Sequence, residues 1–225
     1  MDRIQYLSQF NLLNSLSRED LIEMDELTSI TVFPKNTYIQ TPDSFKEGLY
    51  FIKQGKVRLF KLNNDGKQFT SDILCEGNVF GEMNLIALGT RDHYIEAIEE
   101  SHICLMNKDR FESYLMERPR FMMNMIQVLS ERIVQMSHLT QNLALGNLHD
   151  KILYVIKKLA NQFGYSAHDA EFVRLDYALS HQEIANLVSA TREAVTVALQ
   201  ELVKEHVIQT GFRTVYLHRS QLEEL

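Results

Sequence analysis

The sequence lacks several features that mark particular classes of protein. Its 225 residues include only two cysteines, Cys75 and Cys104, which lie far apart and in no metal-binding spacing. We therefore expect two reduced thiols, with a redox-switch disulfide as the alternative. No apolar run approaches the roughly 18 residues that a membrane-spanning helix needs, and the start, MDRIQYLSQFNLLNS, lacks the apolar core of a signal peptide. The sequence thus predicts a cytoplasmic protein without a membrane partner.

Signatures of catalysis and of metal binding are also missing. The sequence has no glycine-rich phosphate loop, no HExxH motif, no nucleophile elbow and no cysteines and histidines at metal-ligand spacing. Stray carboxylates such as Glu99 and Glu100 are typical of a solvated turn. We predict that the protein is not an enzyme and holds neither a metal nor a cofactor.

An excess of positive charge is absent as well, since the net charge is −7. Residues 147–225 carry 8 Lys or Arg against 10 Asp or Glu, and the other residues carry 15 against 20. Net charge is an average over the whole molecule, so a local patch can still meet phosphate. Any contact with nucleic acid must come from a few well-placed residues.

The N-terminal half predicts a short helix followed by β-structure. Residues 15–27, SLSREDLIEMDEL, are typical of a helix that Ser17 caps. From about 30 to 106, short segments rich in Val, Ile, Phe and Tyr alternate with turns, the clearest at Gln54-Gly55 and Asn64-Asp65-Gly66. Strand pairs joined by such turns form hairpins, so this segment predicts a β-barrel or β-roll.

The segment from about 108 to 145 is typical of one long helix, because neither glycine nor proline occurs between Pro119 and Gly146. Its side chains form a heptad repeat with steps of 4 and 3, which consists of Met122, Ile126, Leu129, Ile133, Met136, Thr140 and Leu143. This repeat favours packing against a second copy of the helix over packing against its own domain. We predict a dimer interface along these residues.

Two short amphipathic helices with almost nothing between them follow in HQEIANLVSATREAVTVALQEL, residues 181–202. Ser180 and Glu183 have the spacing of a capping box, and Thr191 is a good N-cap for the second helix. Only a tight turn at Ser189-Ala190 fits between the helices, so they must cross steeply, as in a helix-turn-helix. The exposed face of the second helix is predicted to carry Arg192, Glu193, Thr196, Val197 and Gln200.

The next segment, HVIQTGFRTVYLHR, alternates about Gly211 and predicts a β-hairpin, the wing of a winged helix. With this hairpin, nearly the whole sequence resembles the Crp–Fnr superfamily of bacterial transcription regulators. The resemblance rests on GxVxL at residues 55–59, on GNVFGE at residues 77–82 and on QEIA…TREAV near the C-terminus.

The resemblance implies an α+β fold with an N-terminal cyclic-nucleotide-binding-type β-roll, a long dimerisation helix and a C-terminal winged helix-turn-helix. We accordingly predict a sensor domain over 1–107, a dimerisation helix region over 108–146 and a DNA-binding domain over 147–225. The resemblance also implies a homodimer that reads a two-fold symmetric site on double-stranded DNA and works with RNA polymerase.

Carried over by motif, Gln182 would contact phosphate, Arg192 would read a guanine edge, and Glu193 would accept from cytosine or orient an arginine. The complete set of predicted DNA contacts is Ser180, Gln182, Thr191, Arg192, Glu193, Thr196, Val197 and Arg213. Val197 stands where the family often has an arginine, which predicts a different half-site. Ser189 stands at a turn that usually has glycine.

Some relatives bind cyclic AMP through a glycine-glutamate pair and an arginine-serine pair. Gly81 and Glu82 match the first pair, and Arg91 matches the arginine after a one-residue deletion, but Asp92 replaces the serine. A carboxylate beside the cyclic phosphate is repulsive. We therefore predict that cyclic AMP is not the effector and that Glu82 and Arg91 have structural roles, with Arg91 paired to Asp92 or Glu82.

Met136 and Ser137 complete the predicted effector pocket. They align with the two residues that contact adenine in the relatives that bind cyclic AMP, and only one of the two matches. The sequence has no N-terminal cysteine cluster for an iron–sulfur centre, and His93 and His102 are better explained as packed or surface residues than as haem ligands. An unidentified small molecule, a thiol switch and constitutive DNA binding all stay open. The competing function is a β-roll sensor whose helical C-terminal domain binds a protein instead of DNA.

Overall fold

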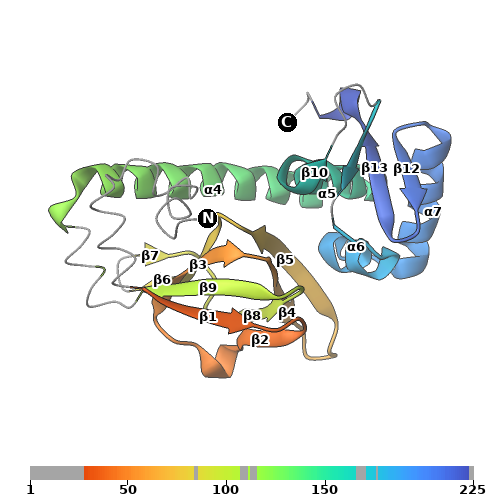
Figure 1. Cartoon of the computed structure of the whole chain (residues 1–225). Coiled ribbons are helices and arrows are strands. Elements are labelled where there is room, and N and C mark those ends of the chain that lie inside the picture. Colours follow the sequence, from red (N-terminus) through yellow and green to blue (C-terminus); the bar gives the residue numbers. More distant parts are fainter. Residues whose placement is uncertain are drawn as a thin grey trace. The chain divides into compact units, whose positions relative to one another are not determined.

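The computed structural model describes residues 28–83, 86–106, 111, 116–165, 171–175 and 177–222. The chain divides into two compact units, Met1–Gln135 and Met136–Leu225 (Figure 1). The helix predicted over 15–27 lies outside the described residues. Across the described ranges, no helix is long and apolar enough to cross a membrane.

The first unit contains a β-roll made of two antiparallel sheets. Its strands are β1 (Ser29–Phe33), β2 (Thr37–Gln40), β3 (Gly48–Gln54), β4 (Lys56–Leu62), β5 (Gln68–Cys75), β6 (Val79–Met83), β7 (Ile86–Ala87), β8 (Tyr94–Ala97) and β9 (Ser101–Met106), with a 3-10 turn η2 (Pro42–Ser44) after β2. One sheet has the strand order β1-β9-β3-β6-β7, and the other has the order β2-β8-β4-β5. The β-roll was the expected architecture for this part of the chain.

One of the two predicted hairpin turns is instead a corner between the sheets. The turn at Asn64-Asp65-Gly66 joins β4 to β5 in a hairpin, as predicted. The strands on either side of Gly55, β3 and β4, belong to different sheets. Gly55 has a φ of +93°, and a Cβ at this position would lie 2.5 Å from the Glu100 carbonyl oxygen. Glycine is required here because the chain passes so close to other backbone while it changes sheet.

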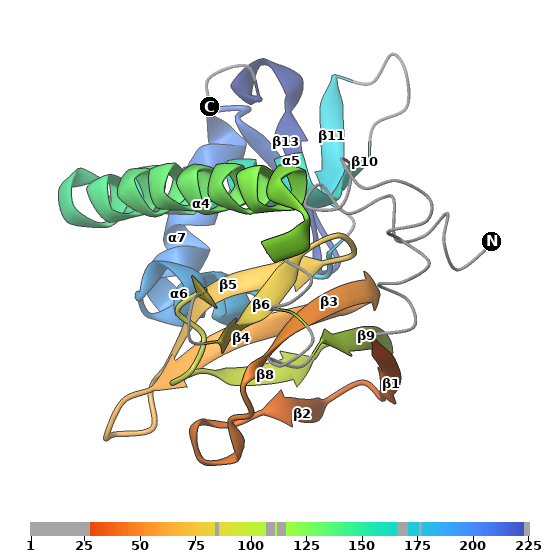
Figure 2. The same cartoon turned by 90° about the vertical axis from the view of Figure 1, so that its left-hand side faces the viewer.

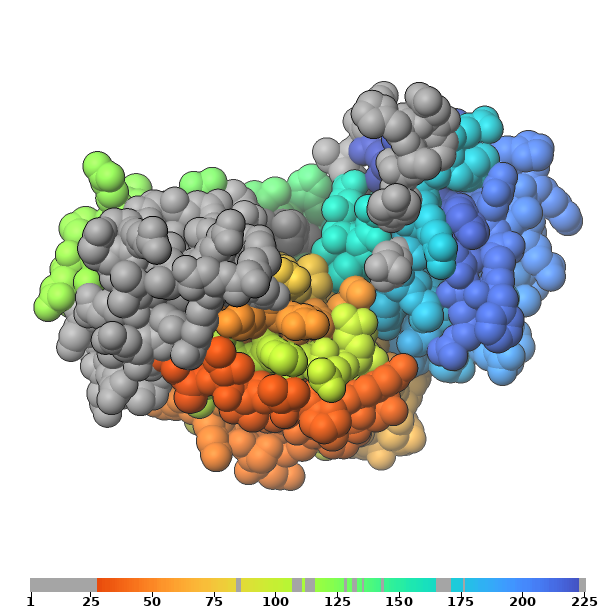
Figure 3. Space-filling model, in the orientation of Figure 1, coloured from red at the N-terminus to blue at the C-terminus, as the bar shows by residue number. Residues whose placement is uncertain are grey.

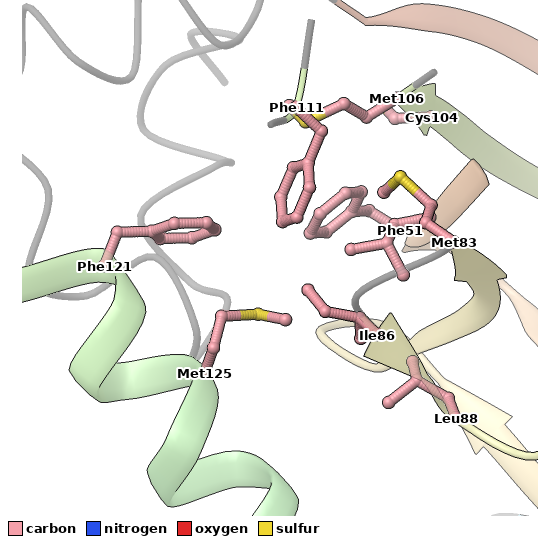
Figure 4. Packing of buried hydrophobic residues seen from close by; sticks show 10 residues of the cluster. Phe51, Met83, Ile86, Leu88, Cys104, Met106, Phe111, Phe121 and Met125 are labelled. Carbon is pink, nitrogen blue, oxygen red and sulfur yellow. The ribbon is translucent and has the colours of Figure 1, made fainter. Parts of the chain in front are cut away.

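Two apolar clusters hold the first unit together. One of them draws its side chains from both sheets, and its buried members are Tyr50, Ile52, Val57, Leu59, Leu74, Phe80, Ile95 and Ile103. The other joins the β-roll to the long helix α4 (Pro119–Leu145). In Figure 4, Phe121 and Met125 of α4 point toward Phe51, Met83 and Ile86 of the roll. The start of α4 is therefore anchored on its own β-roll.

The second unit packs short helices against a small sheet. Its elements after α4 are α5 (Leu148–Phe163), β10 (Gly164–Tyr165), β11 (Phe172–Leu175), α6 (His181–Val188), α7 (Arg192–Lys204), β12 (Ile208–Gly211), β13 (Thr214–His218) and a 3-10 turn η3 (Arg219–Gln221). The sheet has the antiparallel order β10-β11-β13-β12. Asn147 caps α5 and forms a capping box with Asp150, so the chain restarts a helix directly after Gly146.

Each helix of this unit buries one apolar face. The buried residues of α5 include Ile152, Val155, Ile156, Leu159 and Phe163, and those of α7 are Val195, Ala198, Leu199 and Leu202. In α6, Ile184 and Val188 are buried, whereas Leu187 is only half-buried. Ala185 is fully buried and small, as the close approach of a second helix requires.

Candidate DNA interface and effector site

Two N-caps and one left-handed residue build the helix-turn-helix. The Ser180 hydroxyl accepts from the Glu183 N–H at 3.2 Å, and the Glu183 carboxylate accepts from the Ser180 N–H at 2.7 Å. This reciprocal pair is the predicted capping box. The chain leaves α6 at Ser189, which has a φ of 57° and a ψ of 38°. Thr191 then caps α7 by accepting from the Ala194 N–H at 3.2 Å.

The outer face of α7 carries the residues that were predicted there. Arg192, Glu193 and Gln200 are exposed, Thr196 is half-buried, and the Val197 side chain is 55% exposed. Arg192 and Glu193 occupy the first turn, where the backbone N–H groups without intrahelical partners lie. The positive end of the helix dipole is at the same place, so this turn suits contacts with phosphate and base edges.

Two polar side chains of the predicted interface are held by neighbours. Gln182 is exposed and donates from Nε2 to Asn186 Oδ1 at 3.0 Å. The Thr196 hydroxyl donates to the Arg192 carbonyl oxygen at 2.9 Å and lies 2.8 Å from His181 Nδ1. Because the only hydroxyl hydrogen goes to the carbonyl, His181 is assigned as the donor in the second contact.

His181 is absent from the predicted site residues, although this contact ties the start of α6 to the outer face of α7. The sequence feature that could have indicated His181 is its position, because it is a polar residue directly after the N-cap Ser180. The partner Thr196 lies 15 residues further along the chain, so the contact itself cannot be seen from local spacing.

The wing turns one residue later than predicted. Gly211 pairs with Thr214, so the turn consists of Phe212 and Arg213 and is not centred on Gly211. Arg213 is exposed and has a φ of 53°. Phe212 is 94% exposed. In the space-filling view, the residues of the wing (dark blue) lie at the surface of the second unit (Figure 3).

Two of the predicted effector residues, Gly81 and Glu82, contact the loop between β7 and β8, and a third, Arg91, belongs to this loop. Gly81, with a φ of 110°, donates its N–H to the Thr90 hydroxyl at 3.0 Å. Glu82 Oε1 accepts from the backbone N–H of Arg91 at 2.9 Å. The Arg91 guanidinium lies 5.0 Å from the centre of the Phe45 ring, within cation–π distance. Glu82 and Arg91 are thus brought together, but through the Arg91 backbone and not through two opposite charges.

A buried amide that is absent from the predicted site residues holds the same loop. Gln40 donates from Nε2 to the carbonyl oxygen of Thr90 at 2.8 Å and to that of His93 at 3.3 Å. Asp92, between these two residues, is exposed. The loop conformation is therefore set from β2 by Gln40 and from β6 by Gly81 and its neighbour.

The residues of the predicted dimer interface all lie on α4 but have different surroundings. Met122 and Leu129 are partly buried against the cluster that joins α4 to the β-roll. Ile126, Ile133 and Met136 are 51%, 68% and 61% exposed in the single chain. These three apolar side chains follow one another at steps of 7 and 3, as in the heptad repeat.

The last positions of the repeat continue along α4. Thr140 is exposed, and its hydroxyl donates to the Met136 carbonyl oxygen at 2.8 Å. The side chain of Leu143 lies outside the described residues. Ser137, which was predicted as an effector contact together with Met136, is exposed and belongs to the second unit.

The described residues include no group of three or more His, Cys, Asp or Glu that could hold a metal ion. Cys75 is half-buried and Cys104 is buried, and the two are not joined in a disulfide.

Two family models match the chain, one in each unit. Residues 30–118 match the cyclic nucleotide-binding domain, and residues 155–225 match the Crp-like helix-turn-helix domain. The global nitrogen regulator of Nostoc sp. is 28% identical over 192 residues, which cover 84% of this chain and 85% of the relative. The cyclic AMP receptor protein of Thermus thermophilus is 26% identical over 201 residues, which cover 87% of this chain and 89% of the relative.

Solved structures agree on the fold. A mutant of CooA from Carboxydothermus hydrogenoformans superimposes with a TM-score of 0.75 at 22% identity, covering 95% of this chain and 93% of that one. The likeness and the two matched models confirm the predicted fold class, a β-roll followed by a long helix and a helix-turn-helix domain.

Proposed function

Because the chain is a member of the Crp–Fnr superfamily and a DNA-binding transcription regulator, we propose that it acts as a homodimer on a two-fold symmetric site, without cyclic AMP as its effector. The exposed, capped first turn of α7, together with the exposed wing that follows this helix, carries this proposal. A regulator of this kind works on chromosomal DNA in the cytoplasm together with RNA polymerase.

The first turn of α7 supplies groups that suit base recognition. Arg192 has the fork of donors that matches the O6 and N7 acceptors of guanine, and Glu193 can accept from the cytosine amino group. Val197, one turn further on, offers a methyl surface that suits the thymine methyl group and cannot read guanine. Ser180, Gln182 and the other predicted polar contacts would position the domain on phosphate.

The exposed apolar side chains of α4 support the homodimer. Ile126, Ile133 and Met136 are large, more than half exposed and regularly spaced, which is costly in water and typical of a helix that pairs with another helix. In a symmetric dimer the two α7 helices must stand about 34 Å apart, one turn of DNA, to reach both half-sites.

The surroundings of Arg91 argue against cyclic AMP. The guanidinium sits over Phe45, and the carboxylate of Glu82 already accepts the Arg91 N–H. Asp92 adds a negative charge where a cyclic phosphate would need a donor. A neutral or cationic small molecule is more compatible with these groups, and binding without any effector is the remaining alternative.

Selection of sites from random duplex DNA tests the proposal, with the purified, reduced protein in the presence and absence of cyclic AMP. We expect a palindromic consensus without the nucleotide and no change in affinity when it is added. A consensus that appears only with cyclic AMP contradicts the effector part. Recovery of no consensus under either condition contradicts DNA recognition without an effector and favours the protein-binding alternative.

A pair of variants of α7 tests the assignment of the base contacts. Arg192→Ala and Lys204→Ala each remove an exposed cation, from the first and the last turn respectively. We expect Arg192→Ala to cost roughly 1–3 kcal/mol of binding and to relax specificity at one base pair, whereas Lys204→Ala is close to neutral. Val197→Arg is expected to add a guanine to the selected half-site.

A further inference from the structure

The hydroxyl group of Thr196 uses most of its hydrogen-bonding capacity within the protein. It donates to the Arg192 carbonyl oxygen at 2.9 Å, and its oxygen lies 2.8 Å from His181 Nδ1. A hydroxyl has one hydrogen and two acceptor lone pairs. With the hydrogen on the carbonyl and one lone pair on the His181 N–H, a single lone pair remains. Thr196 is half-buried on the outer face of α7, so this lone pair is what its hydroxyl can offer to DNA.

The hydroxyl cannot donate to DNA in either tautomer of the His181 ring. If Nδ1 carries no proton, the Thr196 hydroxyl can turn its hydrogen from the carbonyl to Nδ1, which then accepts. The hydrogen is used inside the protein in both arrangements, and only acceptor capacity is left over. Thr196 is therefore expected to accept a hydrogen bond from a base and not to donate one.

His181 decides how the Thr196 side chain is turned. In a helix, threonine divides between two χ1 rotamers, because its hydroxyl can reach a carbonyl of the preceding turn in both. Only a rotamer that keeps Oγ1 at 2.8 Å from Nδ1 retains the contact with His181. The ring belongs to α6, and both views show α6 beside the end of α7 at which that helix begins (Figures 1 and 2). The Thr196 rotamer is thus fixed from outside its own helix.

The polar neighbours of His181 in α6 are engaged elsewhere. Ser180 and Glu183 bond each other in the capping box, and Gln182 donates to Asn186 at 3.0 Å. Across the residues that the structure describes, Thr196 is the only hydrogen-bond partner of the His181 side chain. The half-buried ring therefore has no alternative partner in its own helix that would draw it away from α7.

The acceptor that remains on Thr196 can distinguish between bases. In the major groove, adenine and cytosine present an amino group, whereas guanine and thymine present carbonyl oxygens. An oxygen that can only accept is attracted by the amino group and repelled by the carbonyl oxygen. This preference is the opposite of that of Arg192, whose guanidinium can only donate.

We propose that His181 is a specificity-determining residue that acts through Thr196: by holding the Thr196 side chain in one rotamer, it makes the base opposite Thr196 in each half-site an adenine or a cytosine. His181 is a positioning residue here, since it sets the place of the Thr196 oxygen and needs no contact with the base. Thr196 is thereby assigned to a base edge and not to phosphate. The inference rests on the DNA recognition proposed above.

Base analogues in the selected site measure this contribution. Thr196→Val keeps the shape of the side chain without the hydroxyl, and the base at which this variant loses discrimination is the base opposite Thr196. An adenine at that place is replaced by purine, or a cytosine by a pyrimidinone that lacks the amino group. We expect the wild type to bind the analogue duplex about fivefold more weakly, which corresponds to one neutral hydrogen bond, and Thr196→Val to bind both duplexes equally.

Variants of His181 separate positioning from packing. His181→Asn keeps an N–H donor close to the place of Nδ1 and should retain the preference for the amino group. His181→Leu fills the space without a donor and should lose most of this preference. Because the two residues act as a unit, His181→Leu should have little further effect on the preference when it is combined with Thr196→Val in a double-mutant cycle.

His149→Leu is the matched control. His149 Nε2 lies 2.6 Å from Glu201 Oε2, so this variant removes a histidine contact that joins a different helix, α5, to α7. It should leave the preference for the amino group unchanged, whatever its effect on the unfolding temperature.

The inference is overturned if His181→Leu keeps the wild-type preference, or if His149→Leu loses it as well. The first result means that Thr196 is fixed without His181, and the second means that the preference follows from the general packing of α7. Unchanged discrimination at every base in Thr196→Val, or a guanine or thymine opposite Thr196, also overturns it. All of these results leave the proposed function intact, because the wild type still binds its site. Failure of the wild type to select any duplex would instead contradict the proposed function.

Discussion

Replacing Gly81 by alanine should unfold the β-roll locally, whether or not an effector is present. Gly81 has a φ of +110°, and a Cβ there would lie 2.2 Å from the Gly48 carbonyl oxygen and 2.9 Å from the Tyr50 ring. The first contact is with backbone, in the strand to which β6 is paired. It cannot be relieved by a side-chain rotation, so the two strands must separate.

The cost has two parts that can be measured separately. Positive φ costs an alanine about 1–2 kcal/mol, and forcing an extra carbon into packed structure costs about 1–3 kcal/mol more. Gly66 is the matched control, because its φ is +76° and a Cβ at this position would have no other atom within 4 Å. Gly66→Ala should therefore lose about 1–2 kcal/mol, and Gly81→Ala about 2–5 kcal/mol.

Amide hydrogen exchange in β3 and β6 of the full-length protein measures the free energy of opening for these strands directly. We expect faster exchange in Gly81→Ala than in Gly66→Ala, together with a lower unfolding temperature of the first unit. If Gly81→Ala loses no more stability than Gly66→Ala, the close approach of the two strands does not limit residue 81. Gly81 would then be better explained as a ligand contact alone.

Three further outcomes follow from particular contacts. Burial raises the pKa of the Tyr50 hydroxyl above its ordinary 10.0, so the folded state keeps a proton that the unfolded state loses. Stability should therefore fall as the pH rises above about 10, and Tyr50→Phe should remove that part of the slope in alkaline denaturation curves. Thr191→Ala removes the cap of α7 and should cost about 1 kcal/mol in thermal unfolding, while Thr191→Ser should be nearly neutral. The double change Ile133→Asp and Met136→Asp should convert the dimer to a monomer in sedimentation, whereas Met123→Asp, at an exposed position outside the heptad repeat, should not.

The parts of the fold that depend on neighbouring residues could be predicted from the sequence. The Ser180-Glu183 capping box and the Thr191 cap both act within one helical turn, and the structure contains both. The resemblance placed Ser189 at a turn position that usually has glycine, and the structure gives this serine the left-handed conformation that glycine favours. Local physics decides such features before tertiary packing does.

Pairing between distant strands could not be predicted in the same way. The turn at Gly55 has the composition of a hairpin turn, but β3 pairs with β9 and β6 instead of with β4. What decides this is the close approach of Gly55 to the backbone at Glu100, 45 residues further along the chain. In the wing, glycine marked the wrong position because the true turn residues, Phe212 and Arg213, have no turn preference.

The effector site shows the same division between local and distant contacts. The motif placed Gly81, Glu82 and Arg91 near one another, and the structure brings them together. Gln40, which lies 50 residues before Thr90, has no motif that links it to this loop. A buried glutamine in an otherwise alternating strand becomes interpretable only when its acceptors are known.

These contacts also constrain how a ligand at Glu82 would act on the β-roll. One carboxylate oxygen of Glu82 accepts a hydrogen bond from the Arg91 N–H. A ligand that binds this oxygen in place of the N–H leaves a backbone donor without its partner unless the loop moves. Gln40 resists that movement, because its amide holds the carbonyl groups on both sides of Asp92. Ligand binding at Glu82 and displacement of the loop are therefore coupled, and a ligand shifts the loop only by as much as it binds the displaced form more tightly. A molecule that leaves the Glu82–Arg91 contact in place would bind without sending a signal through this loop.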